Sequence, residues 1–373
     1  MSADATFFAS ILSGALRAWP SEEVAPDPGH AVEDAIGHGV APLVAQKIGR
    51  GERAWPAPFA TGLVAAARGE IALAGIRERA LTGVLEALAA AGVRLLVIKG
   101  AHLAYALYES PELRPRWDTD LLIDEADRGR TREILERRGY AYVPHVSGSL
   151  VMPQFHFRRE DRSGAADQLD VHWRLAVPQA FSALPLLEEL WDRSMPIPAL
   201  GPAARGPSLA DALLIACAHQ AAHHSEWRAL IWVVDVQRLA ERLSDGEAEV
   251  FVERATRARV RAVASRTLSL ARDLLGARLP RPLASLAREP IDTGEPSAAY
   301  LSPVGPVQRI ALDLRALDGW SARTRLLREH LFPPRAYMRA YAPDTRWPLP
   351  ALYVRRIVVG AARWLTTDRR RSQ

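Results

Sequence analysis

Cysteine and lysine are scarce in this sequence of 373 residues, which contains one cysteine and two lysines. A single cysteine cannot form a disulfide bond within the chain, and such usage is typical of proteins in a reducing compartment. The disulfide-stabilised folds of small secreted proteins are therefore excluded. Cys217 follows the apolar residues 213–216, so we predict that its side chain fills the hydrophobic core rather than acting as a nucleophile.

Long hydrophobic runs are also absent from the sequence. No run of about 18 uninterrupted apolar residues occurs, which predicts that the chain has no transmembrane segment. Residues 1–8 include Asp4 and lack the basic start of a signal peptide. Together with the single cysteine, these features predict a cytoplasmic protein.

Several common catalytic motifs are missing. The chain has no GxxxxGK[ST] phosphate loop, no GxGxxG sequence after a strand and no GxSxG elbow. Their absence excludes the usual nucleoside triphosphatases, dinucleotide-dependent dehydrogenases and α/β-hydrolases. No histidine is followed directly by aspartate, which argues against a phosphohydrolase of the HD type.

The net charge of +5 is small for a chain of this length, and no internal block of basic residues predicts a nucleic-acid surface. The exception is the C-terminal tail, which carries Arg355, Arg356, Arg363 and a basic cluster at 368–371. Such a helix end can contact a membrane or nucleic acid, or can form a solvated face. Nucleic acid remains a possible partner that nothing else in the sequence indicates.

The length of the chain predicts two or three domains or sub-domains, and its apolar fraction of 49% predicts a substantial core. Helical spacing fills the first 90 residues and returns after about residue 209, and residues 70–91 form one predicted amphipathic helix. An α/β unit lies between these regions, and residues 195–208 resemble a linker. Within that unit we expect a helix at 131–138 and a pair of strands within 140–159.

The most informative stretch of the sequence is 95–124. The apolar residues 95–98 predict a buried strand, a helix is expected at 101–108, and a second strand is expected at 117–123. Asp118 and Asp120 would leave the same face of this strand, roughly 7 Å apart along the backbone. Paired carboxylates suit Mg²⁺, which also takes phosphate oxygens. The alternative is an edge strand with two solvated aspartates.

Basic residues stand on both sides of this strand–helix unit. Lys99 ends the first predicted strand. Its compact ammonium can act as a point charge on phosphate where a planar guanidinium does not fit. The alternative is that the lysine stands at this position by chance. Arg114 and Arg116 flank Pro115, and either arginine could clamp phosphate through two hydrogen bonds. Arg116 could equally belong to the solvated surface.

Two further groups of polar residues lie downstream. Residues 168–173 alternate between polar and apolar, so Asp170 and His172 should share one face of a strand, which could also be an ordinary half-exposed strand. His219 and His223 have the i, i+4 spacing that lets two imidazoles bind one zinc ion on a helix. No HExxH motif accompanies them. His219 and Asp235 could instead be buried partners between two helices, or could line a cleft.

Together the motifs KGAxLA, LRPxxDxDLLI and LDVHW give the chain a recognisable signature. With them, and with the later segments 218–240 and 331–343, the sequence from about residue 30 to 360 resembles the uncharacterised nucleotidyltransferase family of bacteria, a branch of the DNA polymerase β-like superfamily. The resemblance implies an α+β fold. It would comprise an N-terminal helical region, a nucleotidyltransferase α/β core and a C-terminal helical region, assigned here to 1–91, 92–200 and 201–373.

The resemblance also implies a two-metal site for nucleotidyl transfer, with Mg²⁺ or Mn²⁺ held by Asp118, Asp120 and Asp170. An NTP, expected to be ATP, would donate a nucleotide to an unknown small molecule, peptide or protein. The triphosphate would meet the helix that begins at Lys99, Gly100 and Ala101, with Arg114 as the favoured clamp. The superfamily commonly has serine or glycine where this chain has Ala101.

Two alternative functions stay open at this point. Because Ala101 offers no hydroxyl to phosphate, the protein could bind nucleotide as a regulatory or scaffold protein without turnover. The same metal site could also transfer a terminal phosphoryl group, as a kinase does. The sequence carries no recognisable code for the acceptor.

Overall fold

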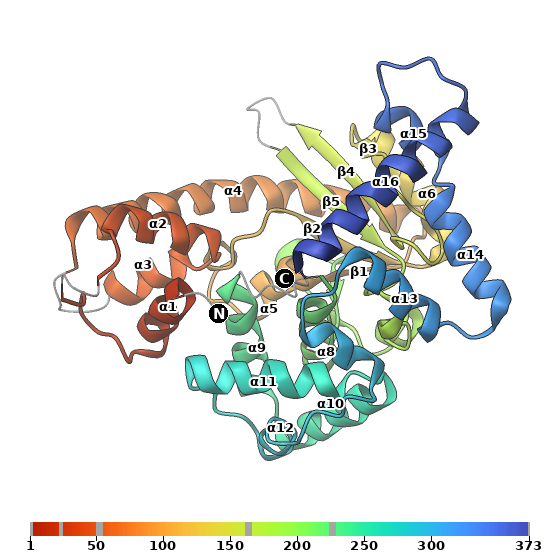
Figure 1. Cartoon of the computed structure of the whole chain (residues 1–373). Helices are drawn as coiled ribbons and strands as arrows, with labels where there is room; N and C mark the ends of the chain where they lie inside the picture. Colours follow the sequence, from red (N-terminus) through yellow and green to blue (C-terminus); the bar gives the residue numbers. More distant parts are fainter. Residues whose placement is uncertain (1–2, 22–24, 50–54, 161–165, 224–228, 372–373) are drawn as a thin grey trace.

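We describe the protein from a computed structural model that covers residues 3–371, apart from 22–24, 50–54, 161–165 and 224–228, and apart from the side chains of His223 and 361–371. A mixed five-stranded sheet forms its centre (Figure 1). The strands are β1 (Leu95–Ile98), β2 (Thr119–Ile123), β3 (Ala141–Val143), β4 (Gln154–Glu160) and β5 (Ala166–His172).

The order of strands across the sheet is β1-β2-β5-β4-β3. Only β2 and β5 run parallel to each other, whereas the pairs β1–β2, β5–β4 and β4–β3 are antiparallel. Helices α5 (Lys99–Ala106), α6 (Arg128–Arg137) and α7 (Leu187–Trp191) belong to the same part of the chain. The predicted helix at 101–108, the helix at 131–138 and the strand pair within 140–159 are confirmed, with shifted ends.

The continuous apolar runs of β1 and β2 are buried on both faces, as such runs predict. Because successive side chains of a strand point to opposite faces, the side chains of β1 and β2 are divided between two hydrophobic cores. Leu95 and Val97 pack with α6 and the end of α4, whereas Leu96 and Ile98 join the larger core formed with the C-terminal helices. The sheet is therefore the layer that joins the two cores, and its polar residues stand on the face toward the larger one.

The N-terminal region consists of helices. They are α1 (Ala3–Ser13), α2 (Pro28–Gly37), α3 (Ala41–Gly49) and α4 (Ala57–Ala90). The long helix α4 runs from the N-terminal helices to the sheet (Figure 1). Its residues Leu81, Leu85 and Leu88 belong to the smaller hydrophobic core, on the face of the sheet that also packs against α6. The helix predicted at 70–91 is confirmed and begins earlier, because Pro58 occupies its first turn, where proline fits a helix.

Helix α4 is long and apolar enough to cross a membrane if length and composition are considered alone. A core helix of a soluble protein can meet the same criterion. The absence of a transmembrane segment and the cytoplasmic location therefore stay predictions from the sequence.

The C-terminal region is also helical and forms the lower and right-hand parts of Figure 1. Its helices are α8 (Leu209–His223), α9 (Leu230–Arg242), α10 (Asp245–Arg257), α11 (Arg261–Leu275), α12 (Arg281–Leu286), α13 (Pro306–Ala316), α14 (Gly319–Leu331), α15 (Arg335–Tyr341) and α16 (Leu349–Arg371). Cys217 on α8 is fully buried and forms no disulfide, which confirms its prediction as core filler. In the tail, Arg356 donates a hydrogen bond to the His330 carbonyl, and most of the other predicted basic side chains lie outside the described residues.

The predicted linker at 195–208 is not a free linker. Strands β6 (Met195–Pro196) and β7 (Arg205–Gly206) form a small antiparallel hairpin, and Ile197 and Leu200 inside it are buried in the core beneath the sheet. The many proline and glycine residues of this stretch predicted a linker, but its few apolar residues are spaced so that they pack together. The hairpin lies beside β1 and covers the start of α5.

Candidate functional site

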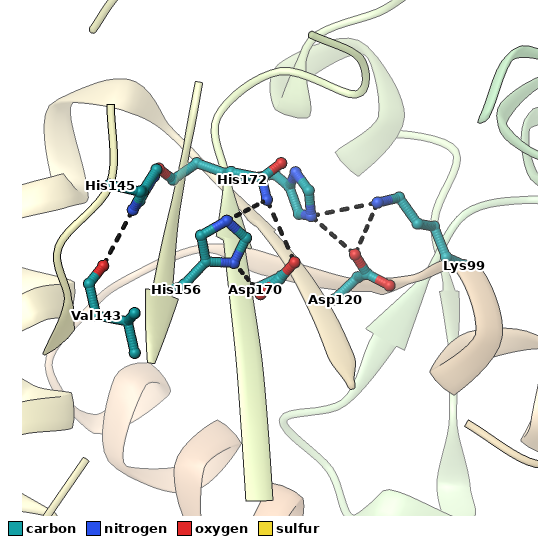
Figure 2. Close-up of polar contacts among 8 residues, drawn as sticks. Lys99, Asp120, Val143, His145, His156, Asp170 and His172 are labelled. Atoms are coloured by element: carbon teal, nitrogen blue, oxygen red, sulfur yellow. Dashed lines mark hydrogen bonds and ion pairs between the residues drawn. The ribbon is translucent and has the colours of Figure 1, made fainter. Parts of the chain in front are cut away.

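Polar side chains meet on the face of the sheet where β1, β2 and β5 are neighbours. The register pairs Asp120 of β2 with Asp170 of β5, and pairs Ile98, the last residue of β1, with Asp120. Because residues paired across neighbouring strands share a face, the two carboxylates point the same way. Asp170 therefore lies on the strand next to Asp120, as predicted. Figure 2 shows the resulting row of side chains.

Asp120 is buried and has two polar partners. Its Oδ1 atom accepts a hydrogen bond from Lys99 Nζ at 2.7 Å and lies 2.8 Å from His172 Nε2 (Figure 2). Burial alone would raise the pKa of Asp120, but Lys99 and His172 hold it well below its usual range. Burial and the neighbouring Lys99 lower the pKa of His172. A neutral His172 with its proton on Nε2 can donate to Asp120, whereas the other tautomer can accept from Lys99, whose Nζ lies 3.3 Å away.

Asp170 is held by residues of β4. Its Oδ1 atom lies 2.6 Å from His156 Nδ1, and its Oδ2 atom accepts a hydrogen bond from Gln154 Nε2 at 3.2 Å. The His145 ring packs edge-on against the His156 ring, with a centroid distance of 4.5 Å. These contacts fix the direction of the Asp170 carboxylate, which stays partly accessible from the pocket.

Within the described residues, one group of side chains has metal-ligand geometry. Single ligand atoms of Asp120, Asp170 and His172 all lie within 4.8 Å of one another. Aspartate oxygens suit Mg²⁺ and Mn²⁺, whereas an imidazole ligand also suits softer ions. The donor set therefore fits a divalent cation, and Lys99 already places one positive charge beside it.

Asp118 stands at the rim of this group, outside the strand that was predicted to contain it. Strand β2 begins at Thr119, because β1 ends at Ile98 opposite Asp120 and the chain then turns into α5. Reduced hydration inside the protein and the charges of Asp120 and Asp170 raise the pKa of Asp118 to about 7. Three clustered aspartates therefore hold more negative charge than Lys99 offsets, and a bound cation would relieve this repulsion.

Helix α5 begins directly after β1, and its first residue has an unusual backbone conformation. Lys99 has a φ of 52°, in the left-handed region that non-glycine residues adopt rarely and at a cost. Ile98 at the N-cap makes no side-chain hydrogen bond to the first turn. The backbone N–H groups of this turn and the positive end of the helix dipole favour an anion there.

Gly100 is required for a reason that the sequence did not reveal. A Cβ atom at this position would lie 3.1 Å from Arg114 Nη1, so the glycine makes room for that guanidinium. Arg114 in turn donates from Nε and Nη2 to Asp235 and from Nη1 to the Pro115 carbonyl. The predicted clamp on phosphate by Arg114 is untested, and all three nitrogens of its guanidinium already donate within the protein.

Tyr108 and Arg116 complete the surroundings of this segment. The Tyr108 hydroxyl donates to Asp235 at 2.7 Å, so the segment just after α5 and helix α9 are joined through one buried carboxylate. Arg116 is only 5% exposed, and its guanidinium carbon lies 5.9 Å from the centre of the Tyr105 ring. The alternative that placed Arg116 on the solvated surface is therefore wrong.

The three aspartates, Lys99 and Arg116 line a cavity of about 410 Å³, within the range of about 300–1,000 Å³ that is typical of small-molecule sites. The sheet, α5 and the segment before β2 contribute mainly polar side chains. Helices α8 and α9 contribute Ala212, Ile215, Ala216, His219, Ile231, Trp232 and Asp235. The alternative that His219 and Asp235 line a cleft is confirmed, whereas the proposed zinc pair includes the His223 side chain, which lies outside the described residues.

Gln154 and His156 were not identified from the sequence as partners of Asp170. The sequence does indicate a half-buried strand there, because residues 154–157 alternate between polar and aromatic. That pattern places Gln154 and His156 on one face. It does not reveal which strand they adjoin, so their contact with Asp170 required the sheet order.

Comparison with known proteins gives one match. A family model described as an uncharacterised nucleotidyltransferase matches residues 25–276, which include the whole sheet, α5, α8 and α9. A search of curated proteins finds no match. The mixed sheet with helical regions at both ends agrees with the α+β fold that the sequence predicted.

Proposed function

The chain belongs to this uncharacterised nucleotidyltransferase family, and we propose that it moves a nucleoside monophosphate from an NTP, with ATP as the expected donor, to an acceptor. The register that pairs Asp120 with Asp170, beside the start of α5 and inside one cavity, carries the proposal. It brings cation ligands, a phosphate-binding helix end and a candidate base together. Membership of the family implies a nucleotide substrate, and the acceptor is unknown.

Asp118, Asp120 and Asp170 would hold Mg²⁺ or Mn²⁺. When bound, the metal would neutralise the triphosphate and lower the pKa of the acceptor hydroxyl. The raised pKa of Asp118 supports this assignment, because the carboxylate lies beside two others without a hydrogen bond or ion pair of its own among the described residues.

The other steps depend on residues of the chain. The first turn of α5 would orient the phosphates through its N–H groups, and Lys99 would offer its ammonium to phosphate once it leaves Asp120. The acceptor oxygen would form a bond to the α-phosphorus while the bond to the bridging oxygen of the β-phosphate breaks. Pyrophosphate leaves, and Asp170, held by His156 and Gln154, would accept the hydroxyl proton.

A second candidate is nucleotide binding without turnover, as in a regulatory or scaffold protein. Two observations favour it: Ala101 has no hydroxyl, and the Arg114 guanidinium already occupies the space above Gly100. A kinase-like transfer of the terminal phosphoryl group would use the same acidic residues. The position of the transferred label separates the three candidates.

The test uses ATP labelled at either the α or the γ phosphate, with Mg²⁺ or Mn²⁺ and a cell extract as the source of acceptor. Label from the α position alone supports nucleotidyl transfer, and label from the γ position alone would establish a kinase. No labelled product with clear ATP binding would favour the regulatory protein. Asp170→Asn should lose transfer but keep ATP affinity within a few-fold, whereas Asp273→Asn, the same change at an exposed position of α11, should match the wild type.

A further inference from the structure

Arg116 is a charged residue of the cavity that the proposed function leaves unused. It lies between Pro115 and Trp117 in the segment that leads into β2, and it lines the cavity although only 5% of its surface is exposed. Arginine is rarely so deeply buried without a partner, because removing its charge from water is costly.

The guanidinium of Arg116 is not satisfied by the protein. Its Nε and Nη2 atoms are buried and have no hydrogen-bond partner within the described part of the chain. Of the acids near it, Glu70 lies 3.4 Å from Arg77, and no ion pair joins Asp118 to Arg116 among the described residues. The Tyr105 ring supports the guanidinium through a cation–π contact but offers no negative charge.

Arg114 and Arg116 differ in their partners. Arg114, two residues earlier, has a carboxylate with which its Nε and Nη2 hydrogen-bond. The cavity therefore contains one guanidinium whose donors are paired and one, Arg116, that can still donate to an oxyanion.

We propose that Arg116 binds the pyrophosphate portion of the donor, the β and γ phosphates, through two nitrogens of its guanidinium. Planar guanidinium and phosphate oxygens match in this paired geometry. Arg116 and Asp118 are two residues apart and line the same cavity, so an oxyanion on Arg116 would share that cavity with a cation held at Asp118. The apolar residues of α8 and α9 leave room for the nucleoside at the other part of the cavity.

This inference rests on the proposed function, in which the donor is a nucleoside triphosphate and the leaving group is pyrophosphate. Negative charge develops on the bridging oxygen of the β-phosphate as the bond to the α-phosphorus breaks. A fixed guanidinium in a buried site stabilises such charge without reorganisation. Arg116 would therefore select a triphosphate over a monophosphate.

The experiment compares the full-length wild type with Arg116→Met and Arg116→Lys by calorimetric titration with pyrophosphate, ATP, AMP and adenosine in Mg²⁺. Arg238→Met is the matched control, because Arg238 also stacks on a tyrosine, 4.5 Å from the centre of the Tyr108 ring just after α5, but does not line the cavity. Arg116→Met should weaken pyrophosphate and ATP about 10- to 100-fold, as expected for charge-assisted bonds, and leave AMP and adenosine within about threefold. Arg116→Lys, which keeps the charge without the fork, should lie between.

The outcomes separate this subsite from the proposed function. Equal weakening of all four ligands, or the same selective loss in Arg238→Met, overturns the assignment to Arg116. If ATP and pyrophosphate bind Arg116→Met as tightly as the wild type while α-label transfer proceeds, the nucleotidyltransferase stands and the subsite falls. If pyrophosphate binding depends on Arg116 but no transfer occurs, the subsite stands without the enzyme. Arg116-dependent binding of inorganic phosphate only to ATP-saturated protein would place the oxyanion on the acceptor and overturn the proposal.

Discussion

Two clusters of buried charge meet in the same cavity and differ in their balance. In the first, Arg114 and Asp235 form an ion pair at 2.7 Å, and Tyr108 donates a further hydrogen bond to the carboxylate. In the second, Lys99 faces Asp120, while Asp118 and Asp170 add negative charge that no described lysine or arginine contacts. One cluster is closed, and the other retains an excess of negative charge.

The difference separates architecture from ligand binding. The closed cluster joins the segment between α5 and β2 to α9, so it fixes the C-terminal helices over the sheet. The open cluster would be a poor structural element, because carboxylates that repel one another weaken the folded state without a cation. We therefore expect mutations in the first to change stability and mutations in the second to change the response to ligands.

The largest effect is expected for Asp235→Ala. The change leaves the Arg114 guanidinium buried without its counter-ion, which typically costs about 3–5 kcal/mol of the free energy of unfolding. Urea denaturation measures this loss. The double variant Arg114→Met/Asp235→Leu should recover most of it, since replacing both charges leaves none uncompensated. A loss below about 1 kcal/mol for Asp235→Ala would show that this cluster does not fix the helices.

The second-largest effect is expected in the open cluster and should appear only when ligand is bound. At a concentration of 100 times its dissociation constant, Mg²⁺–ATP should stabilise the wild type by about 2.7 kcal/mol. Asp118→Asn and Asp120→Asn should each lose most of this gain, which thermal unfolding with and without ligand measures. Asp118→Asn should leave the metal-free protein as stable or more so, because it removes one of the repelling charges. Retention of the full gain in either variant would contradict the assignment of that residue to the metal.

The sequence predicted those parts of the site that depend on local pattern. The apolar run at 95–98 placed Lys99 directly after its strand, and the predicted strand at 117–123 and the alternation at 168–173 placed Asp120 and Asp170 within theirs. The pairing of Asp120 with Asp170 was expected only from the family resemblance. It depends on β5 adjoining β2, which the distribution of apolar residues cannot specify.

What the sequence could not predict depends on contacts between distant segments. Arg114 and Asp235 are separated by 121 positions, so the sequence around Arg114 does not indicate that its hydrogen-bond donors are already paired. The same guanidinium packs closely against Gly100, which the sequence pattern had connected only with the triphosphate. The burial of Arg116 also escaped prediction, because an arginine beside proline in a connecting segment is typical of a surface.

The smallest effect, and the sharpest test of the comparison, is expected for Lys99→Met. The ammonium contacts Asp120 Oδ1 at 2.7 Å and lies 3.3 Å from His172 Nε2, so it competes with any cation for the same ligands. Without it, Mn²⁺ in the absence of nucleotide should bind about tenfold more tightly, a change of about 1.4 kcal/mol. Titration followed by the electron paramagnetic resonance of free Mn²⁺ measures the affinity. Lys47→Met, at the other lysine of the chain, is the control and should match the wild type. Unchanged or weaker Mn²⁺ binding in Lys99→Met would mean that the cation takes ligands other than the oxygen that Lys99 holds, and the second cluster would then be as closed as the first.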